Sequence, residues 1–229
     1  MTMTNVEKIL LGFAALILIS GAVLSFTDPV YFATGLTVED GPTEWLTVVF
    51  LVASMVLCAT RVKNLVGKRN KLFIMTYSLL TLFFFFGAGE EISWGQRIFG
   101  IESGEFFTEN NAQKETNLHN LVVGETKINK LIFGTGLSLI LFTYLVILTP
   151  MYTRSQPVRK FLLTFGVPIP KLYHIASYII LLVIVQLVME ASRRGEITEV
   201  VGSIIVFLNI MFPSNREIYD PEKPLADIK

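Results

Sequence analysis

Long apolar stretches alternate with short polar segments along most of this chain. Six of the stretches are long enough for a membrane crossing, which takes about 17–25 mostly apolar helical residues across a hydrocarbon core about 30 Å thick. They cover residues 9–26, 45–60, 72–88, 131–149, 172–189 and 197–212. The pattern therefore predicts an all-α fold, a polytopic membrane helix bundle with about six transmembrane helices.

The same pattern divides the chain into two parts. Residues 1–212 form the predicted six-helix transmembrane domain, with one large outer loop at about 89–130. Residues 213–229 hold three prolines among mixed charges, so a polar, solvated cytoplasmic tail is expected there. The apolar segment 161–168 is too short to cross and is expected to lie at the interface.

Lysine and arginine accumulate in two of the connecting segments, which gives the expected orientation. The segment after the second stretch and the segment after the fourth contain no acid, and their cations are Arg61, Lys63, Lys68, Arg69, Lys71, Arg154, Arg159, Lys160 and Lys171. Short positively charged loops face the cytoplasm, so both termini are expected inside. Arg193 and Arg194, in the turn before the last stretch, favour the opposite orientation.

Composition supports a membrane protein and excludes other classes. Hydrophobic residues make up 52% of the chain and charged residues 17%, and the mean hydropathy is +0.58, outside the range of water-soluble domains. The 18 Phe, 7 Tyr and 2 Trp provide too much apolar surface for a disordered chain. Formal net charge is zero, which gives no support for nucleic acid as a partner and leaves membrane lipids.

The first candidate site is the run Gly-Glu-Glu-Ile-Ser-Trp-Gly-Gln-Arg at residues 89–97, directly after the third apolar stretch. If the helix continues, Glu90, Trp94 and Arg97 share one face, and Glu91 lies about 100° away. Adjacent carboxylates at a membrane boundary need a cation, a metal or a proton, and Arg97 is the nearest cation. The alternative is an interfacial helix end with its acids in water and its tryptophan in the aromatic belt.

The second candidate site is the polar row at residues 110–120. On a helix, Glu115 and His119 would share a face, so that both could bind one metal ion or the carboxylate could orient the imidazole. Asn117 and Asn120 add amide groups to the same row. A solvated loop remains the alternative.

Further ionisable residues lie at the predicted outer ends of other helices. Glu199 follows Glu196 on the last stretch and is expected to face the bundle, with Arg193 or Arg194 as the alternative partner that neutralises it. Asp40 or Gly41 is expected to cap the second helix, whose first turn contains Pro42. Glu44 is a possible further wall of the same outer site. His174, near the opposite end, is expected to be a packing or interfacial residue.

These residues carry a resemblance to known sequences. The motif Glu90-Glu91-x-Ser93-Trp94-Gly95-Gln96-Arg97, followed by Asn111-x-Gln113-x-Glu115-x-Asn117-x-His119-Asn120, resembles a pattern in uncharacterised bacterial multi-pass membrane proteins. The resemblance implies the bacterial inner membrane and no known activity. The chain is also partly similar to CAAX-type glutamate intramembrane proteases, but five residues separate Glu91 from Arg97 where that family has three, and its later histidine motifs are missing.

The leading hypothesis from the sequence is an outer-leaflet hydrolase or transferase that acts on a lipid-like substrate, assisted by a divalent metal ion. Its expected catalytic residues are Glu90, Glu91, Arg97 and His119. The expected substrate-binding residues are Trp94, Gln96, Asn117 and Asn120, and the expected metal ligands are Glu90, Glu115, His119 and Glu199.

Two other classes of function fit the same residues. One is a cation- or proton-coupled transport or binding protein, although the middles of the helices are poor in polar groups. The other is a non-catalytic subunit of a membrane complex, or a homo-oligomer, whose outer loop contacts a partner.

Overall fold

Among the residues that the structure describes, three helices are long and apolar enough to cross a membrane. They are α1 (Asn5–Thr27), α3 (Pro42–Leu65) and α4 (Lys71–Glu91), which contain the first three predicted stretches. The computed structural model describes residues 2–123, 126–127 and 136–228. Residues 131–135 of the fourth predicted stretch, and residues 124–125 and 128–130 of the predicted outer loop, lie outside the described residues.

The residues that cap α1 and α4 accept hydrogen bonds from free backbone N–H groups of these helices, whereas the cap of α3 makes no side-chain hydrogen bond. The Thr4 side chain accepts a hydrogen bond from the Glu7 N–H (3.2 Å), and the Glu7 carboxylate accepts one from the Thr4 N–H (2.9 Å). Gly41 caps α3, followed by Pro42 in the first turn, as one of the two predicted alternatives has it. Asn70 caps α4 through the N–H of Phe73 (2.9 Å).

The described residues of the remaining apolar stretches are mainly helical as well. α7 (Leu137–Phe142), the π-helical η4 (Thr143–Leu148) and α8 (Thr149–Arg154) follow one another directly. α10 (Leu172–Val183) continues as the π-helical η5 (Ile184–Val188), and α11 (Arg194–Met211) is the last long helix.

Short elements connect the long helices. They are α2 (Pro29–Tyr31), η1 (Phe32–Leu36), η2 (Ser93–Gly95), α5 (Gln96–Phe99), α6 (Glu105–Asn110), α9 (Gln156–Thr164), η6 (Arg216–Tyr219) and η7 (Leu225–Asp227). The strands β1 (Val122–Val123) and β2 (Thr126–Lys127) pair antiparallel, with Val122 opposite Lys127 and Val123 opposite Thr126. The all-α expectation is therefore correct apart from this hairpin.

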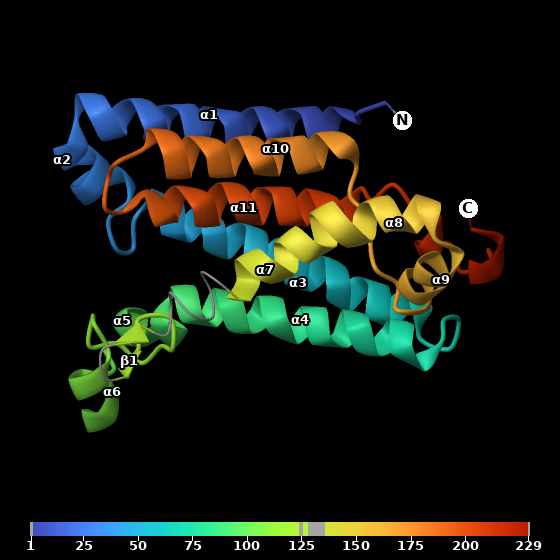
Figure 1. Cartoon of the computed structure of the whole chain (residues 1–229). Helices are drawn as coiled ribbons and strands as arrows, with labels where there is room; N and C mark the ends of the chain where they lie inside the picture. Colours follow the sequence, from blue (N-terminus) through green and yellow to red (C-terminus); the bar gives the residue numbers. More distant parts are fainter. Residues whose placement is uncertain (1, 124–125, 128–135, 229) are drawn as a thin grey trace.

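α11 is the central helix of the bundle. It packs against α1, α3 and α10 (Figure 1), and Val200, Ile204 and Leu208 have no exposed surface. By contrast, α1 leaves Ile9, Leu16 and Ile19 more than half exposed. Apolar side chains thus lie both inside the bundle and on its outer surface, as a lipid environment requires.

Both termini lie at one end of the bundle, beside α8 and α9 (Figure 1). The elements α2, α5, α6 and β1 lie at the opposite end. The acidic and amide-rich motifs are therefore at the end away from the termini.

The expectation of a solvated C-terminal tail is wrong. Ile218 is fully buried, and the Tyr219 hydroxyl lies 2.5 Å from the Tyr77 hydroxyl of α4. The guanidinium of Arg61 stacks 3.5 Å above the Tyr219 ring. The prolines and charges of the segment masked these two apolar residues, which fold back onto the ends of α3 and α4.

Candidate functional site

A cavity of about 250 Å³ lies at the end of the bundle away from the termini. Its walls come from the segment before α3, from α3, α4 and α5, from the loop at residues 111–121, and from the start of α11. The lining residues are Glu39, Glu44, Glu90, Glu91, Arg97, Gln113, Glu115, Asn117, His119, Asn120, Ser192, Arg193, Gly195, Glu196 and Glu199. Eight of the residues expected at the site therefore line one cavity: Glu90, Glu91, Arg97, Glu115, Asn117, His119, Asn120 and Glu199.

The chain reverses sharply after α4, so the expected continuous helix through residues 90–97 is wrong. Ser93, Trp94 and Gly95 have φ values of 47°, 55° and 76°, all in the left-handed region. Only glycine adopts that region without strain, and two other residues in succession cost about 1–2 kcal/mol each. Contacts made by the turn must compensate for this cost.

Glu90 provides those contacts. One carboxylate oxygen accepts the Trp94 indole N–H (2.8 Å), and the other accepts the backbone N–H groups of Leu118 (2.6 Å) and His119 (2.9 Å). The side chain is 4% exposed. Glu90 therefore fastens the end of α4 to the 111–121 loop, and both of its oxygens are already in use.

The second motif is a compact loop rather than a helix, so Glu115 and His119 do not share a helix face. Asn111 organises the loop: its amide donates to Asn117 (2.9 Å), and its carbonyl oxygen accepts the N–H groups of Gln113 and Glu115. Asn117 in turn donates to the Ser93 hydroxyl (2.8 Å). Short amide side chains satisfy backbone groups in this way in turns, which the helical spacing argument overlooked.

The expected substrate-binding residues separate into two groups. Asn117 and Asn120 line the cavity, whereas Trp94 and Gln96 do not. Gln96 accepts the Thr116 N–H (2.7 Å) and donates to the Ser103 hydroxyl (2.7 Å). Gln96 therefore holds the loop through the Thr116 N–H, and Trp94 acts on it only through Glu90, to which its indole donates.

Arg97 is surrounded by carboxylates from three segments. Its Nε lies 2.8 Å from Asp40 Oδ2 and its Nη2 lies 3.2 Å from Glu44 Oε1, while Nη1 contacts Glu115. One guanidinium thus neutralises only part of the negative charge around it. With its donors occupied, Arg97 is poorly placed for the expected role of holding an anionic headgroup.

The carboxyl groups of Glu91 and Glu199 stand opposite this network. Within the described residues, neither has a hydrogen bond or an ion pair to the protein, and both line the cavity. The expected neutralisation of Glu199 by the neighbouring arginines does not occur: Arg193 pairs with Glu39 (2.9 Å), and Arg194 donates to the Met189 carbonyl. Two carboxyl groups without a hydrogen-bond or ion-pair partner among the described residues therefore face the cavity.

The expected metal ligands line one cavity but do not form a coordination group. No cluster of three or more His, Cys, Asp or Glu side chains at metal-binding spacing occurs among the residues that the structure covers. The physical reason lies in the partners: the oxygens of Glu90 and Glu115 bind N–H, O–H and guanidinium donors, which a metal ion would have to displace.

His119 lines the cavity close to the acids. Removal from water lowers the pKa of its imidazole below the usual 6.5, and the negative charges of Glu90 and Glu39 partly oppose this shift. At neutral pH the uncharged form of the imidazole is therefore favoured.

Several residues that line the cavity were not among the site residues predicted from the sequence. Glu39 and Arg193 form an ion pair between the segment before α3 and the segment before α11, and Glu196 follows on α11. The only sequence feature that these residues share with the predicted site is their position near helix ends on the same predicted side of the membrane. That pattern could have indicated proximity, but not contact.

Comparison of the chain with protein-family models, with curated proteins and with solved structures gives no match.

Proposed function

We propose that this chain is a six-span protein of the bacterial inner membrane, with both termini in the cytoplasm, that binds an organic cation in the cavity at its outer end. The described residues of the six predicted stretches lie mainly in helical runs, and the two termini lie at the same end (Figure 1). An even number of crossings agrees with that arrangement, and the basic segments at the same end agree with a cytoplasmic location.

The observation that carries the binding proposal is the number of carboxyl groups that line the cavity. Seven glutamates line it, against the two guanidiniums of Arg97 and Arg193, which are already paired with acids. A positive charge about 4 Å from a carboxylate gains roughly 4 kcal/mol at an effective dielectric constant of about 20, before desolvation. An anionic group would be repelled by a similar amount, so a cation is the favoured ligand.

The size of the cavity and the arrangement of its acids favour an organic cation over a bare metal ion. A volume of about 250 Å³ is far larger than one ion and approaches the roughly 300 Å³ of small-ligand sites. An ammonium group can bind single carboxylates at separate positions, so it does not need three ligands at one point. Glu91 on α4 and Glu199 on α11 are such separate positions.

Conduction through the bundle fits less well. Below Glu199, the buried face of α11 presents Ile204, Ile205 and Leu208, each at most 1% exposed. Among the described residues of α11 beyond Glu199, only Ser203 and Asn209 are buried polar groups, so this mostly apolar layer offers a poor polar route from the cavity toward the other end. Binding or chemistry at the outer face is therefore favoured over transport.

The binding proposal is tested on the full-length protein in phosphatidylcholine nanodiscs by calorimetric titration with spermidine. The double variant Glu91→Gln/Glu199→Gln should weaken spermidine binding about tenfold or more, because hydrogen bonds to charged groups contribute about 1.5–3 kcal/mol each. Titration with Mn²⁺ provides the comparison with a metal ion.

The matched control is Glu105→Gln/Glu109→Gln, which removes two exposed acids of α6 outside the cavity. This control should bind spermidine as the natural protein does. Absence of spermidine binding, equal losses in both double variants, or tight Mn²⁺ binding that spermidine does not displace would each overturn the proposal.

One observation favours a second candidate, hydrolysis or group transfer on a lipid-like substrate that carries a cationic group. The uncharged imidazole of His119 lines the same cavity as the acids, so it can act as a general base beside the bound cation. Glu90 and Arg97 then act as positioning residues for the loop and the acids, while Glu91 faces the substrate.

The two candidates separate in the variant His119→Gln. With labelled membrane lipids as substrate, the enzyme hypothesis expects product from the natural protein and at least a hundredfold loss in this variant, with spermidine binding retained. Equal product formation by both proteins would exclude the enzymatic role of His119 and leave the binding proposal intact.

A further inference from the structure

A second cavity, of about 530 Å³, lies at the end of the bundle that carries the termini. It is a groove between the end of α3, the segment that leads to α4, and the C-terminal segment. We refer to it as the basic groove; its walls include Lys63, Asn64, Val66, Lys68, Tyr219 and Pro221. It shares no residue with the acidic cavity at the opposite end.

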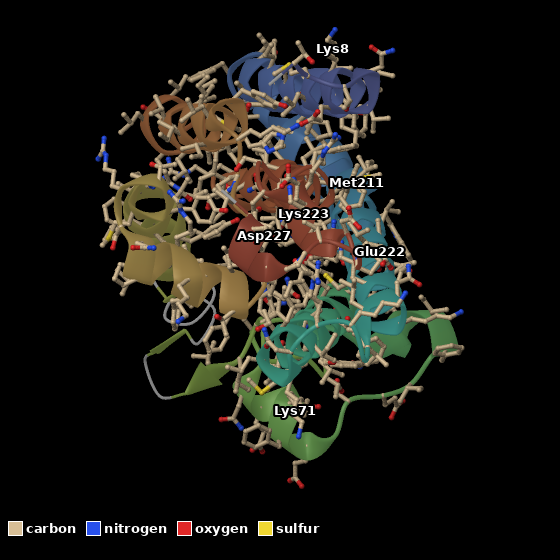
Figure 2. The ribbon with its side chains drawn as sticks, turned by 90° about the vertical axis from the view of Figure 1, so that its right-hand side faces the viewer. Lys8, Lys71, Met211, Glu222, Lys223 and Asp227 are labelled. Carbon is tan, nitrogen blue, oxygen red and sulfur yellow. The ribbon has the colours of Figure 1, made fainter. Side chains whose placement is uncertain are left out.

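The C-terminal segment is fastened along this groove by an arginine that is not itself free to bind a ligand. Arg69 donates from Nε to the carbonyl oxygen of Ile218 (3.0 Å) and from Nη2 to that of Lys223 (3.1 Å), and it also contacts the carbonyl of Asp220. Figure 2 views this end of the bundle, where Glu222, Lys223 and Asp227 lie between Lys8 and Lys71. Hydrogen bonds from the Arg69 side chain to backbone carbonyl oxygens of the C-terminal segment thus hold this wall of the groove in place.

The two lysines of the groove retain their positive charge toward solvent. Within the described residues, neither Lys63 nor Lys68 has an ion pair, although acids occur in the adjoining segment. Two of those acids have other partners: Glu217 pairs with Lys223, and the Asp220 carboxylate accepts the Glu222 N–H (3.1 Å). The groove therefore presents two ammonium groups and an amide, a set that suits a phosphate.

The groove lies where two membrane-capable helices meet. α3 ends at Leu65 and α4 begins at Lys71, and both are long and apolar enough to span a bilayer. Val66 and Leu72 at this level are 58% and 40% exposed. A lipid whose acyl chains run along the apolar surfaces of α3 and α4 would carry its headgroup to the height of the groove, which a free anion in solution cannot do.

We propose that the basic groove binds the phosphate headgroup of an anionic phospholipid, with Lys63 and Lys68 as its charged contacts. The binding ties the α3–α4 connection and the C-terminal segment to the membrane surface. It does not depend on the proposed ligand of the outer cavity.

The test measures lipid binding to the full-length protein in neutral detergent micelles. Phosphatidylglycerol and phosphatidylcholine with the same acyl chains are titrated separately, and the bound lipid is counted by native mass spectrometry. Phosphatidylglycerol should bind more tightly, and Lys63→Gln/Lys68→Gln should weaken it about 30-fold, the equivalent of ~1 kcal/mol for each lysine. Increasing salt should weaken binding to the natural protein and have little effect on the variant.

The matched control is Lys8→Gln/Lys160→Gln, which removes two exposed lysines at the same end of the bundle but outside the groove. Its affinity for phosphatidylglycerol should stay within about threefold of that of the natural protein, because salt screens the attraction between charges that are more than a Debye length apart. Equal affinity for the two lipids, or equal losses in the two double variants, would overturn the proposal. Displacement of the lipid by an equal concentration of inorganic phosphate would assign the groove to a free anion instead.

Discussion

At the scale of single residues, the outer cavity depends on a small number of groups that hold others in place. Arg97 contacts three acids, and Glu90 fixes both the indole of Trp94 and the backbone of the 111–121 loop. Neither group is free to take part in chemistry at its own charged atoms. Their chemical effect is to place other side chains, above all His119, along the wall of the cavity.

Replacement of Arg97 should destabilise the fold through the acids that it leaves behind. Arg97→Gln removes the cation shared by Asp40, Glu44 and Glu115. We expect a loss of about 2–4 kcal/mol, below the roughly 3–5 kcal/mol of a fully buried pair because the guanidinium is partly exposed. Thermal unfolding in detergent measures the change. The second substitution Glu44→Gln should restore part of it, and an unchanged melting temperature for Arg97→Gln would contradict the shared-cation interpretation.

The imidazole of His119 should give the protein a defined pH dependence. Its pKa in the folded state lies below the usual 6.5 because burial disfavours the charged form. The unfolded chain therefore binds the proton more readily, so stability falls as the pH decreases below about 6.5 and levels off below the folded pKa. Denaturant unfolding between pH 5 and about pH 8, compared with His119→Gln, measures this contribution. An imidazole NMR titration with a midpoint above 6.5 would contradict it.

At the scale of elements, the ends of the helices matter more than their lengths. α4 carries Glu90 and Glu91 into the cavity only because the chain reverses within η2, where the Trp94 ring packs back over Gly89. At the opposite end of the bundle, Glu7 of α1 binds the ammonium of Lys171 (2.6 Å) and the hydroxyl of Tyr173 (2.6 Å) at the start of α10. Side chains at helix ends therefore set how the elements meet.

Two glycines of α4 offer a matched comparison. A Cβ atom at Gly89 would lie 2.8 Å from the Trp94 ring, whereas one at Gly87 would make an ordinary 3.6 Å contact with Leu51. We expect Gly87→Ala to stabilise the helix by about 0.5–1 kcal/mol. Gly89→Ala should instead displace the indole from Glu90, shift the emission of Trp94 in a Trp45→Phe background, and weaken spermidine binding. Identical emission and binding in both alanine variants would refute the role of this packing.

The contact between α1 and α10 should behave as a buried ion pair. Glu7 has no exposed side-chain surface and Lys171 has 11%, so Glu7→Gln leaves an uncompensated ammonium and should cost about 3–5 kcal/mol. Thermal unfolding provides the measurement, with the exposed Glu222→Gln as the control. Combination of Glu7→Gln with Lys171→Met should recover most of the loss, and no recovery would indicate that the pair is not the source.

At the scale of the whole molecule, two chemically different ends face away from each other. The acidic cavity lies at one end, and the basic groove lies at the end with both termini. α11 connects the two ends through a buried apolar face. This separation suits a protein that interacts with different groups on the two sides of a membrane.

Labelling of introduced cysteines tests this arrangement. The natural Cys58 is fully buried, so the background reaction with a membrane-impermeant maleimide should be low. In spheroplasts, Glu109→Cys on α6 should react at once, whereas Glu222→Cys in the C-terminal segment should react only after lysis. Reaction of both positions from the same side would contradict the proposed topology.

The sequence by itself determined the helical elements and the polar motifs. Apolar stretches of sufficient length fix helices, because a backbone in lipid must satisfy its own hydrogen bonds, and Pro42 marks where one of them begins. The sequence also grouped Glu90, Glu115, His119 and Glu199 as one set of residues, and all four line the same cavity.

Only the tertiary structure decided which of these polar groups are bound to other parts of the chain and which can bind a ligand. Arg97 and Glu44 are 53 residues apart, and Arg61 reaches the carbonyl of Ile210 across 149 residues. Helical periodicity describes neighbours three or four positions apart and carries no information about such contacts. It therefore missed the reversal at Trp94, the amide-organised loop and the folded C-terminal segment. Each of these is stabilised by long-range packing and hydrogen bonding, which exist only once distant segments have come together.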